Sequence, residues 1–266
     1  MKKSLLKMIM VLFLLLCFVA VASAGPTIDS VLKKKELVVG TSGTYAPLTF
    51  KAKDGNPRGL DIDLSRFIAG AMNVKLRVGV IPFDELIPAL ESGKIDMILS
   101  CMTITPERNL RVAYIGPYFM SGQSILTTKD VAININGLAD INKPDFSIAV
   151  PKGTTTEKIA KMMLPKAKLV VAKSTDDALN LLLKKKVVAM MGDYPYVSVA
   201  SVRYKDKGFV ANPPFSAEPI GIAVRQDDPL LMNLLQNLLI LLRGDGLLDD
   251  MTRRWFADTT WIADLP

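Results

Sequence analysis

Hydrophobic positions alternate along the chain between two spacings. Residues 36–41 (ELVVGT) form a short apolar run of the kind found in a buried strand. The apolar residues that come next recur at the i, i+3, i+4, i+7 spacing of one helix face, at Leu64, Phe67, Ile68 and Ala71. The runs KLRVGVI and IDMILS flank a second helical spacing, at Phe83, Leu86, Ile87 and Leu90. This half of the chain predicts strands joined by helices.

The alternation starts again after residue 145. The runs FSIAV, KLVVA and VVAMMGD predict strands, and the segments between them predict one helix from about residue 155 to 164 and another from Ser174. Ser174 stands three residues before Asp177, a spacing typical of a helix start. Two such series separated by an irregular stretch predict an α/β protein of two lobes, each a mainly parallel sheet with flanking helices.

A late apolar run, IGIAV at residues 220–224, follows the second series. We expect this strand to return to the first lobe, which requires two crossings between the lobes, near residues 118–122 and 217–221. The expected organisation is a first lobe of residues 25–119 and 220–266 and a second lobe of residues 120–219. A cleft between two such lobes is a common place for a ligand.

The apolar run at residues 230–242 has two interpretations. A membrane-spanning helix needs roughly 20 apolar residues. This run is shorter and is interrupted by Asn233, Gln236 and Asn237. A buried amphipathic helix is the better prediction.

The first 24 residues have the pattern of a cleaved export signal. Lys2, Lys3 and Lys7 precede an unbroken apolar stretch at residues 8–22, and residues 22–24 (ASA) match a cleavage site. An uncleaved anchor and a lipoprotein modified at Cys17 are the alternatives. No basic stop follows residue 24, and Leu16 is a poor match for the small residue expected before a lipidated cysteine. We expect a soluble secreted protein.

Composition excludes several kinds of chemistry. None of the 266 residues is a histidine, which removes Ser-His-Asp and Cys-His catalysis and histidine-containing zinc sites. Without residues 1–24, 30 of the 33 basic residues and all 26 acidic residues remain, a mild net charge of +4. We expect no nucleic acid partner, no metal and no cofactor. Cys101 is then the single cysteine, so the stability of the chain has to come from its core.

Polar residues gather where predicted strands end. In open α/β sheets a ligand lies beyond the carboxyl ends of the strands, next to helix N-termini. Four such ends carry suggestive chemistry: residues 41–45 (TSGTY), 100–108 (SCMTITPER), 152–157 (KGTTTE) and Asp193. Thr105 can cap a helix that Pro106 opens, with Arg108 one turn in.

These ends supply complementary charges. Arg108 offers a planar fork for a carboxylate, amides around Thr103 and Thr155 offer further donors, and Asp193 offers a charge for an ammonium group. Each residue also has a purely structural interpretation: a surface ion pair for Arg108 or a helix cap for Asp193. Their joint placement at strand ends favours a site for a zwitterion.

Residues 83–122 resemble the signature of a known family. The run FDELIPALESGKIDMILSCMTITPERNLRVAYIGPYFMSG is similar to the polar amino-acid-binding proteins, family 3 of the solute-binding components of bacterial ABC importers. The resemblance extends over GTSGTYAPLTF, GLDIDL, GTTTE, VVAMMGD and the closing residues 255–256. It implies a type II two-lobed periplasmic binding protein with two hinge crossings. Such a protein closes on a free amino acid, acts as a monomer by default, and delivers its cargo to an inner-membrane permease.

The resemblance also implies roles for individual residues. It implies that Arg108 clamps the ligand α-carboxylate, helped by Thr103 and the turn at Thr154 and Thr155. It implies that Asp193 pairs with the α-ammonium group, assisted by Ser100 and Cys101, and that Tyr45 and Phe83 sandwich the ligand side chain. The remaining position of the expected site is Ser42, where binders of glutamine and basic amino acids often carry aspartate. This departure favours a neutral or acidic ligand side chain.

Two other functions remain open. Periplasmic cyclohexadienyl (arogenate/prephenate) dehydratases resemble the same fold, and Glu157 in GTTTE stands where a general acid could protonate a leaving hydroxyl. A glutamate there is also favourable in the first turn of a helix. A sensor domain of a receptor kinase or ion channel ranks last.

A nucleophilic role for Cys101 is disfavoured because no histidine can deprotonate it. Lys152 and Lys173 are candidates for the cleft mouth.

Overall fold

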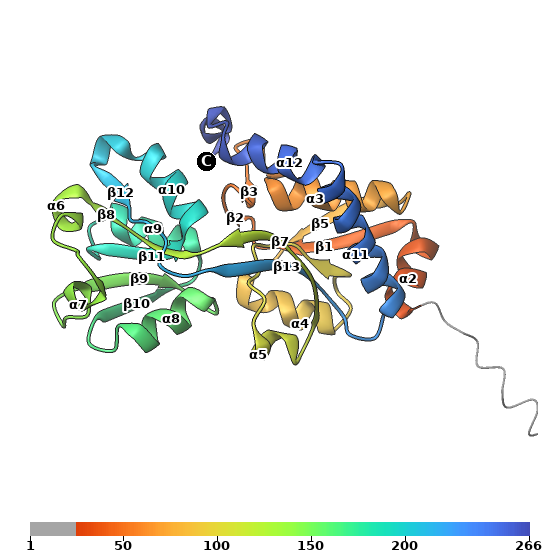
Figure 1. Cartoon of the computed structure of the whole chain (residues 1–266), viewed down its shortest axis with the longest axis horizontal. Helices are drawn as coiled ribbons and strands as arrows, with labels where there is room; N and C mark the ends of the chain where they lie inside the picture. The colour runs from red at the N-terminus through yellow and green to blue at the C-terminus, as the bar shows by residue number, and fades with distance from the viewer. Residues whose placement is uncertain (1–24) are drawn as a thin grey trace, which may run out of the picture.

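The computed structural model describes residues 25–266, which form two lobes joined by extended strands (Figure 1). Each lobe is built on a five-stranded sheet. The predicted export signal, residues 1–24, lies outside the described residues.

The first sheet has the strand order β5-β1-β6-β13-β7. The bounds in that order are Lys75–Val80, Glu36–Thr41, Met97–Ile98, Glu218–Val224 and Ala113–Ser121. Strands β5, β1 and β6 are mutually parallel, whereas β13 is antiparallel to both β6 and β7. Five residues of β1 are buried, as expected for a strand covered on both faces.

The second sheet has the order β10-β9-β11-β8-β12. Its strands are Lys168–Ala172, Ser147–Pro151, Ala189–Asp193, Gln123–Thr128 and Phe209–Ala211. Again one strand, β8, runs against its neighbours. A small third sheet lies beside the first lobe: β2 (Thr44–Tyr45), β3 (Thr49–Lys51) and β4 (Pro57–Arg58).

Helices surround the two large sheets. Those on the first lobe's side are α2 (Pro26–Lys34), α3 (Leu60–Ala71), α4 (Leu86–Glu91), α5 (Pro106–Asn109), α11 (Pro229–Gly244) and α12 (Leu247–Phe256). Those of the second lobe are α6 (Lys129–Ala132), α7 (Leu138–Ile141), α8 (Thr155–Met163), α9 (Thr175–Leu183) and α10 (Tyr194–Arg203). The described residues also contain three short 3₁₀ helices: η1 (Phe83–Glu85), η2 (Lys205–Lys207) and η3 (Thr260–Asp264).

The antiparallel strands explain how the chain passes between the lobes. Strand β7 ends at Ser121 and β8 begins at Gln123, so the chain leaves one sheet and enters the other almost without a turn. It comes back from β12 into β13 (Figure 1). A strand that enters a sheet directly from the other lobe runs antiparallel to the remaining strands of that sheet. The two sheets are therefore mixed, with four strands in one direction and one against them.

Apolar periodicity correctly predicts the helices that cover the sheets. Leu64 and Ile68 on α3 are buried, as the spacing requires. The run at residues 230–242 forms most of α11, which buries Leu235 and Leu239 and leaves Ile240 exposed, so it is amphipathic. Within residues 25–266, no helix combines the length and the hydropathy that a membrane crossing requires.

Candidate ligand-binding site

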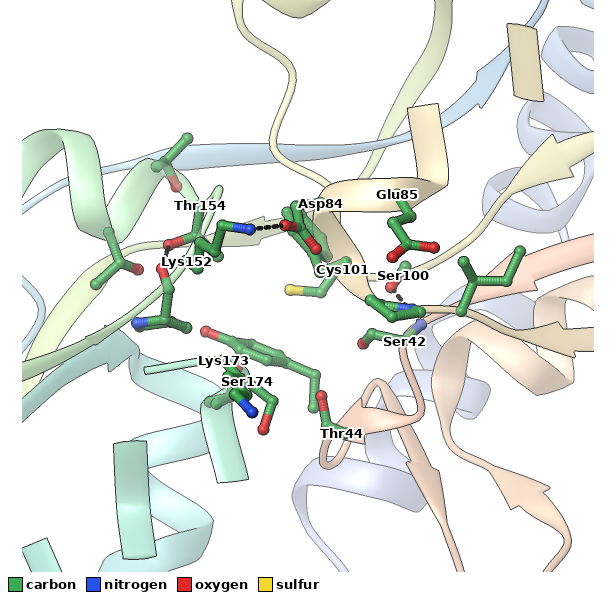
Figure 2. A pocket seen from close by; sticks show the side chains of 18 of the residues that line it. Ser42, Thr44, Asp84, Glu85, Ser100, Cys101, Lys152, Thr154, Lys173 and Ser174 are labelled. Atoms are coloured by element: carbon green, nitrogen blue, oxygen red, sulfur yellow. Dashed lines mark hydrogen bonds and ion pairs between the residues drawn. The ribbon is translucent and has the colours of Figure 1, made fainter. Parts of the chain in front are cut away.

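A cavity of about 470 Å³ lies between the lobes. Figure 2 shows residues of the first lobe, among them Ser42 and Ser100, facing Lys152 and Ser174 of the second. All ten residues of the expected site line this one cavity: Ser42, Tyr45, Phe83, Ser100, Cys101, Thr103, Arg108, Thr154, Thr155 and Asp193. The structure thus brings together residues that are up to 151 positions apart in the chain, from Ser42 to Asp193.

Arg108 is held in the cavity wall by its own short helix. Thr105 caps α5 by accepting a hydrogen bond from the Arg108 amide, as the sequence predicts. The guanidinium donates to the carbonyl oxygen of Thr103 at 2.9 Å and, across the cleft, to that of Gly153 at 3.3 Å. Its central carbon lies 5.4 Å from the Phe83 ring centroid, a cation–π contact. Burial lowers the pKa of Arg108, but a guanidinium stays charged at neutral pH.

Asp193 ends strand β11 and is buried. Its Oδ2 accepts a hydrogen bond of 2.6 Å from the Tyr45 hydroxyl, and its Oδ1 accepts one of 2.8 Å from Nε2 of Gln123. Burial raises the pKa of Asp193 to about 7. The negative charge of Glu218 adds to this rise in pKa, while the Tyr45 hydrogen bond and the Arg108 charge oppose it.

The turn at Ser100 and Cys101 is fixed by hydrogen bonds. The Ser100 hydroxyl accepts from the Ser42 amide at 2.9 Å (Figure 2). The Cys101 amide donates to Oδ2 of Asp61 at 2.8 Å, which holds Cys101 in a left-handed conformation with φ of 48°. Burial, with the charge of Asp193 adding to it, raises the pKa of the Cys101 thiol well above its ordinary value. The thiol therefore stays protonated and is a poor nucleophile.

Hydroxyl groups from both lobes meet at the far end of the cavity. Thr154 is the N-cap of α8, and Thr155 is its first residue. The Thr155 hydroxyl donates to Oε2 of Glu218 at 2.8 Å, and so does the Thr103 hydroxyl from the first lobe. Thr103 precedes the start of α5 by three residues and forms an isolated bridge with Ile220. The N–H groups at the start of this helix therefore begin only at Glu107, because Pro106 has no N–H.

Sequence reasoning missed two polar residues behind the cavity wall, Gln123 and Glu218. Each begins a strand at a crossing, β8 and β13 respectively. A signal existed for Glu218, because a charged residue inside the predicted apolar crossing at residues 217–221 needs a buried partner. Lys152 and Lys173, left open by the sequence, both line the cavity. Lys152 forms an ion pair of 2.7 Å across the cleft with Asp84 (Figure 2).

Glu157 has neither the place nor the protonation expected of a general acid. It is absent from the described residues that line the cavity. Its Oε2 accepts from the Gly153 amide at 2.7 Å, and its Oε1 pairs with Lys161. Burial alone raises the pKa of Glu157, but these partners outweigh it and leave the pKa below the ordinary value. A general acid needs the opposite shift.

Within residues 25–266, no cluster of three or more acidic or cysteine side chains could hold a metal ion.

Comparison with known proteins decides the family. The model of the bacterial extracellular solute-binding proteins, family 3, matches residues 37–258. The chain belongs to this family. Membership confirms the resemblance carried by residues 83–122 and agrees with the two-lobed α/β fold.

Several relatives of this family-3 protein are named as amino acid-binding proteins. The ABC transporter arginine-binding protein 1 of Escherichia coli (strain K12) is 29% identical over 227 residues, covering 82% of this chain and 89% of that protein. A solved ancestral amino acid-binding protein, a precursor of cyclohexadienyl dehydratase, is 39% identical with a TM-score of 0.81. The alignment covers 86% of this chain and 99% of the ancestral one. An ancestral arginine-binding protein bound to arginine is 33% identical with a TM-score of 0.77, covering 84% and 98% of the two chains.

Proposed function

We propose that this protein captures a free amino acid in the cavity between its lobes and delivers it to the permease of an ABC importer. One observation carries the proposal: Arg108 and Asp193, a cation and an acid, line the same cavity from opposite lobes. A zwitterion satisfies both groups at once. Relatives that are named as arginine-binding and amino acid-binding proteins support this ligand class.

The geometry of the cavity supports a role for each residue that lines it. Arg108 receives the α-carboxylate, with the backbone N–H groups at Thr103, Thr154 and Thr155 adding donors around it. The hydroxyl groups of these threonines already donate to Glu218 and to the carbonyl oxygen of Pro151. Asp193 receives the α-ammonium group. Tyr45 and Phe83 form aromatic walls on either side of the ligand's side chain. Ser42, Ser100 and Cys101 line the rest of the cavity.

We propose a hinged clamp as the mechanism. The lobes are residues 25–119 with 220–266, and residues 120–219, and they rotate about the two crossings. The open form binds the carboxylate end of the amino acid on the first lobe through Arg108, and closure brings Asp193 onto the ammonium group. Cross-cleft contacts, such as the Lys152–Asp84 ion pair, belong to the closed arrangement. The ligand shifts the equilibrium only by its extra affinity for the closed form.

The proposed setting is the periplasm of a bacterial cell. Residues 1–24 direct export and are cleaved, and the mature protein acts as a monomer. Its closed form presents the two lobe tips to the inner-membrane permease. The name of the family, extracellular solute-binding proteins, supports this setting.

A thermal-shift panel on refolded, ligand-free mature protein tests the proposal. The twenty standard amino acids are added singly, with arogenate and prephenate beside them. An amino acid at 100 times its dissociation constant stabilises the protein by about 2.7 kcal/mol, which is readily visible as a rise in Tm. Stabilisation by one or a few amino acids supports the proposal and names the cargo. No response to any amino acid, with arogenate or prephenate converted to product, would replace it with the dehydratase.

A further inference from the structure

Glu218 is a buried carboxylate at the hinge that ties both lobes together. It begins strand β13, and only 4% of it is exposed. Its Oε2 accepts hydrogen bonds of 2.8 Å from Thr103 of the first lobe and Thr155 of the second. Its Oε1 accepts one of 2.9 Å from Nε2 of Gln123. Within the described part of the chain, Glu218 stands behind the residues that line the cavity and is not one of them.

Gln123 joins Glu218 to the proposed ammonium site. Its Nε2 donates to Glu218 and also to Oδ1 of Asp193, at 2.8 Å. Ionised carboxylates only accept hydrogen bonds, so the amide nitrogen has to face them. The Thr156 hydroxyl donates to the amide oxygen at 2.8 Å and fixes the same orientation. Two carboxylates therefore share one amide nitrogen and lie no farther apart than the sum of the two hydrogen-bond lengths.

Among the described residues, 25–266, uncharged groups make the direct contacts with this carboxylate pair. The side chains that face Asp193 are uncharged: the Tyr45 and Ser121 hydroxyls, the Cys101 thiol and the Gln123 amide. Arg108 is the cation whose field reaches both carboxylates, and the proposed α-carboxylate would neutralise it. Within residues 25–266, neither Asp193 nor Glu218 forms an ion pair with a lysine or arginine. Two buried like charges at this separation are unfavourable unless a cation joins them.

We propose that Glu218 is a specificity-determining residue, which acts through Asp193 and Gln123 to make the cavity select ligands that carry a protonated amino group. This inference rests on the proposed function, because it takes Asp193 as the partner of that amino group. The negative charge of Glu218 strengthens the local field on a cation at Asp193 and penalises a neutral or anionic group there. A deamino analogue, with hydrogen in place of the α-amino group, leaves the pair without a cation.

A pH effect follows from the same geometry. Burial, with Glu218 adding to it, brings the pKa of Asp193 to about 7, so Asp193 is partly protonated near neutral pH in the ligand-free protein. An ammonium group needs the ionised form. Affinity for an amino acid therefore falls as the pH drops below the pKa of Asp193. Removing the charge of Glu218 lowers that pKa and moves the fall in affinity to more acidic pH.

The experiment compares Glu218→Gln with the wild-type protein. Glu91→Gln is the matched control, because Glu91 is a surface residue paired with Arg111. The probes are the amino acid that binds the wild type most tightly among the twenty standard ones and its deamino analogue. Calorimetric titration gives both dissociation constants across a range of pH. We expect Glu218→Gln to reduce the preference for the amino acid by about tenfold and to shift the midpoint of its pH profile to lower pH. Glu91→Gln should change neither quantity.

The possible outcomes distinguish a failure of the inference from a failure of the proposed function. A folded Glu218→Gln protein with the wild-type preference and pH midpoint leaves Glu218 only structural, although the amino acid site itself stands. Failure of the wild type to bind any amino acid overturns the proposed function instead. If Glu218→Gln does not fold, Glu218→Asp keeps the charge on a shorter side chain and should retain the wild-type preference. Loss of the preference in Glu218→Asp would contradict a role based on charge.

Discussion

The hydroxyl group of Tyr45 makes two hydrogen bonds with Asp193 across the cleft. It donates to Oδ2 at 2.6 Å and accepts from the Asp193 amide at 2.8 Å. Tyr45 belongs to β2 beside the first lobe, and Asp193 ends β11 of the second. The carboxylate assigned to the ligand amino group is thus held by the same tyrosine that is expected to form an aromatic wall.

Tyr45→Phe should make amino acid binding more sensitive to acid. The Tyr45 hydrogen bond lowers the pKa of Asp193, so its loss raises that pKa above about 7. The fall in affinity then moves to higher pH, opposite to the shift expected for Glu218→Gln. Calorimetric titration from about pH 5.5 to pH 8.5 spans the ionisation and measures the midpoint. Tyr204→Phe is the control, and a midpoint unchanged in Tyr45→Phe would contradict the prediction.

Arg108→Ala should weaken binding strongly. A buried charge partner of a ligand carboxylate contributes about 2–5 kcal/mol when the other charge is left unpaired, so affinity should fall by about thirtyfold or more. Arg108→Lys keeps the charge but loses the planar fork and should be intermediate. Arg111→Ala, at an exposed arginine paired with Glu91, serves as the control. Near-normal affinity in Arg108→Ala would contradict the assignment of Arg108 to the ligand carboxylate.

Asp193→Asn should weaken amino acids far more than their deamino analogues. The amide that replaces the carboxylate carries no charge for an ammonium group, and it places a donor where only acceptors now lie. Binding of the analogue does not use that charge and should change little. Equal losses for both compounds would indicate that Asp193 supports the cavity wall rather than the amino group.

Asp61 should make the ligand-free protein lose stability as the pH rises. Burial raises the pKa of Asp61 to about 6, although hydrogen bonds from Tyr118 and the Cys101 amide oppose the rise. The folded protein therefore binds a proton that the unfolded chain, with a pKa near 4, has already released, so the folded state loses this advantage as pH rises from about 4 to 6. From pH 5 to pH 7.5 the free energy of unfolding should fall by about 1 kcal/mol more in the wild type than in Asp61→Asn.

Urea unfolding at the two pH values measures this difference. Asp250→Asn on α12 is the control, because Asp250 is an exposed residue that pairs with Arg253 on the same helix. Parallel pH dependence in the wild type and Asp61→Asn would show that Asp61 keeps an ordinary pKa in the folded protein.

Local patterns predicted much of the fold and the residues that line the cavity. The strand at residues 36–41 and the cap at Ser174 depend on neighbours in the sequence, so they could be read directly. Thr105 and Arg108 lie within one turn of each other, and their geometry was predictable for the same reason.

Other features depend on distant segments and could not be predicted this way. The reversed directions of β8 and β13 follow from the path between the lobes rather than from any local pattern. The shared Gln123 amide brings together residues from three strands, with Glu218 95 positions from Gln123. No periodicity within one element reports such a contact.

The order of strands in the first sheet has a consequence for how the protein folds. Strand β13 lies between β6 and β7, yet it follows them in the chain only after the whole second lobe. The second sheet is complete once β12 has been made, whereas the first keeps an open gap until residues 218–224 arrive. A nascent chain can therefore finish the inserted lobe first, and the lobe that contains the N-terminus closes last. Such long-range pairing slows folding, so the first lobe should reach its native state later than the second.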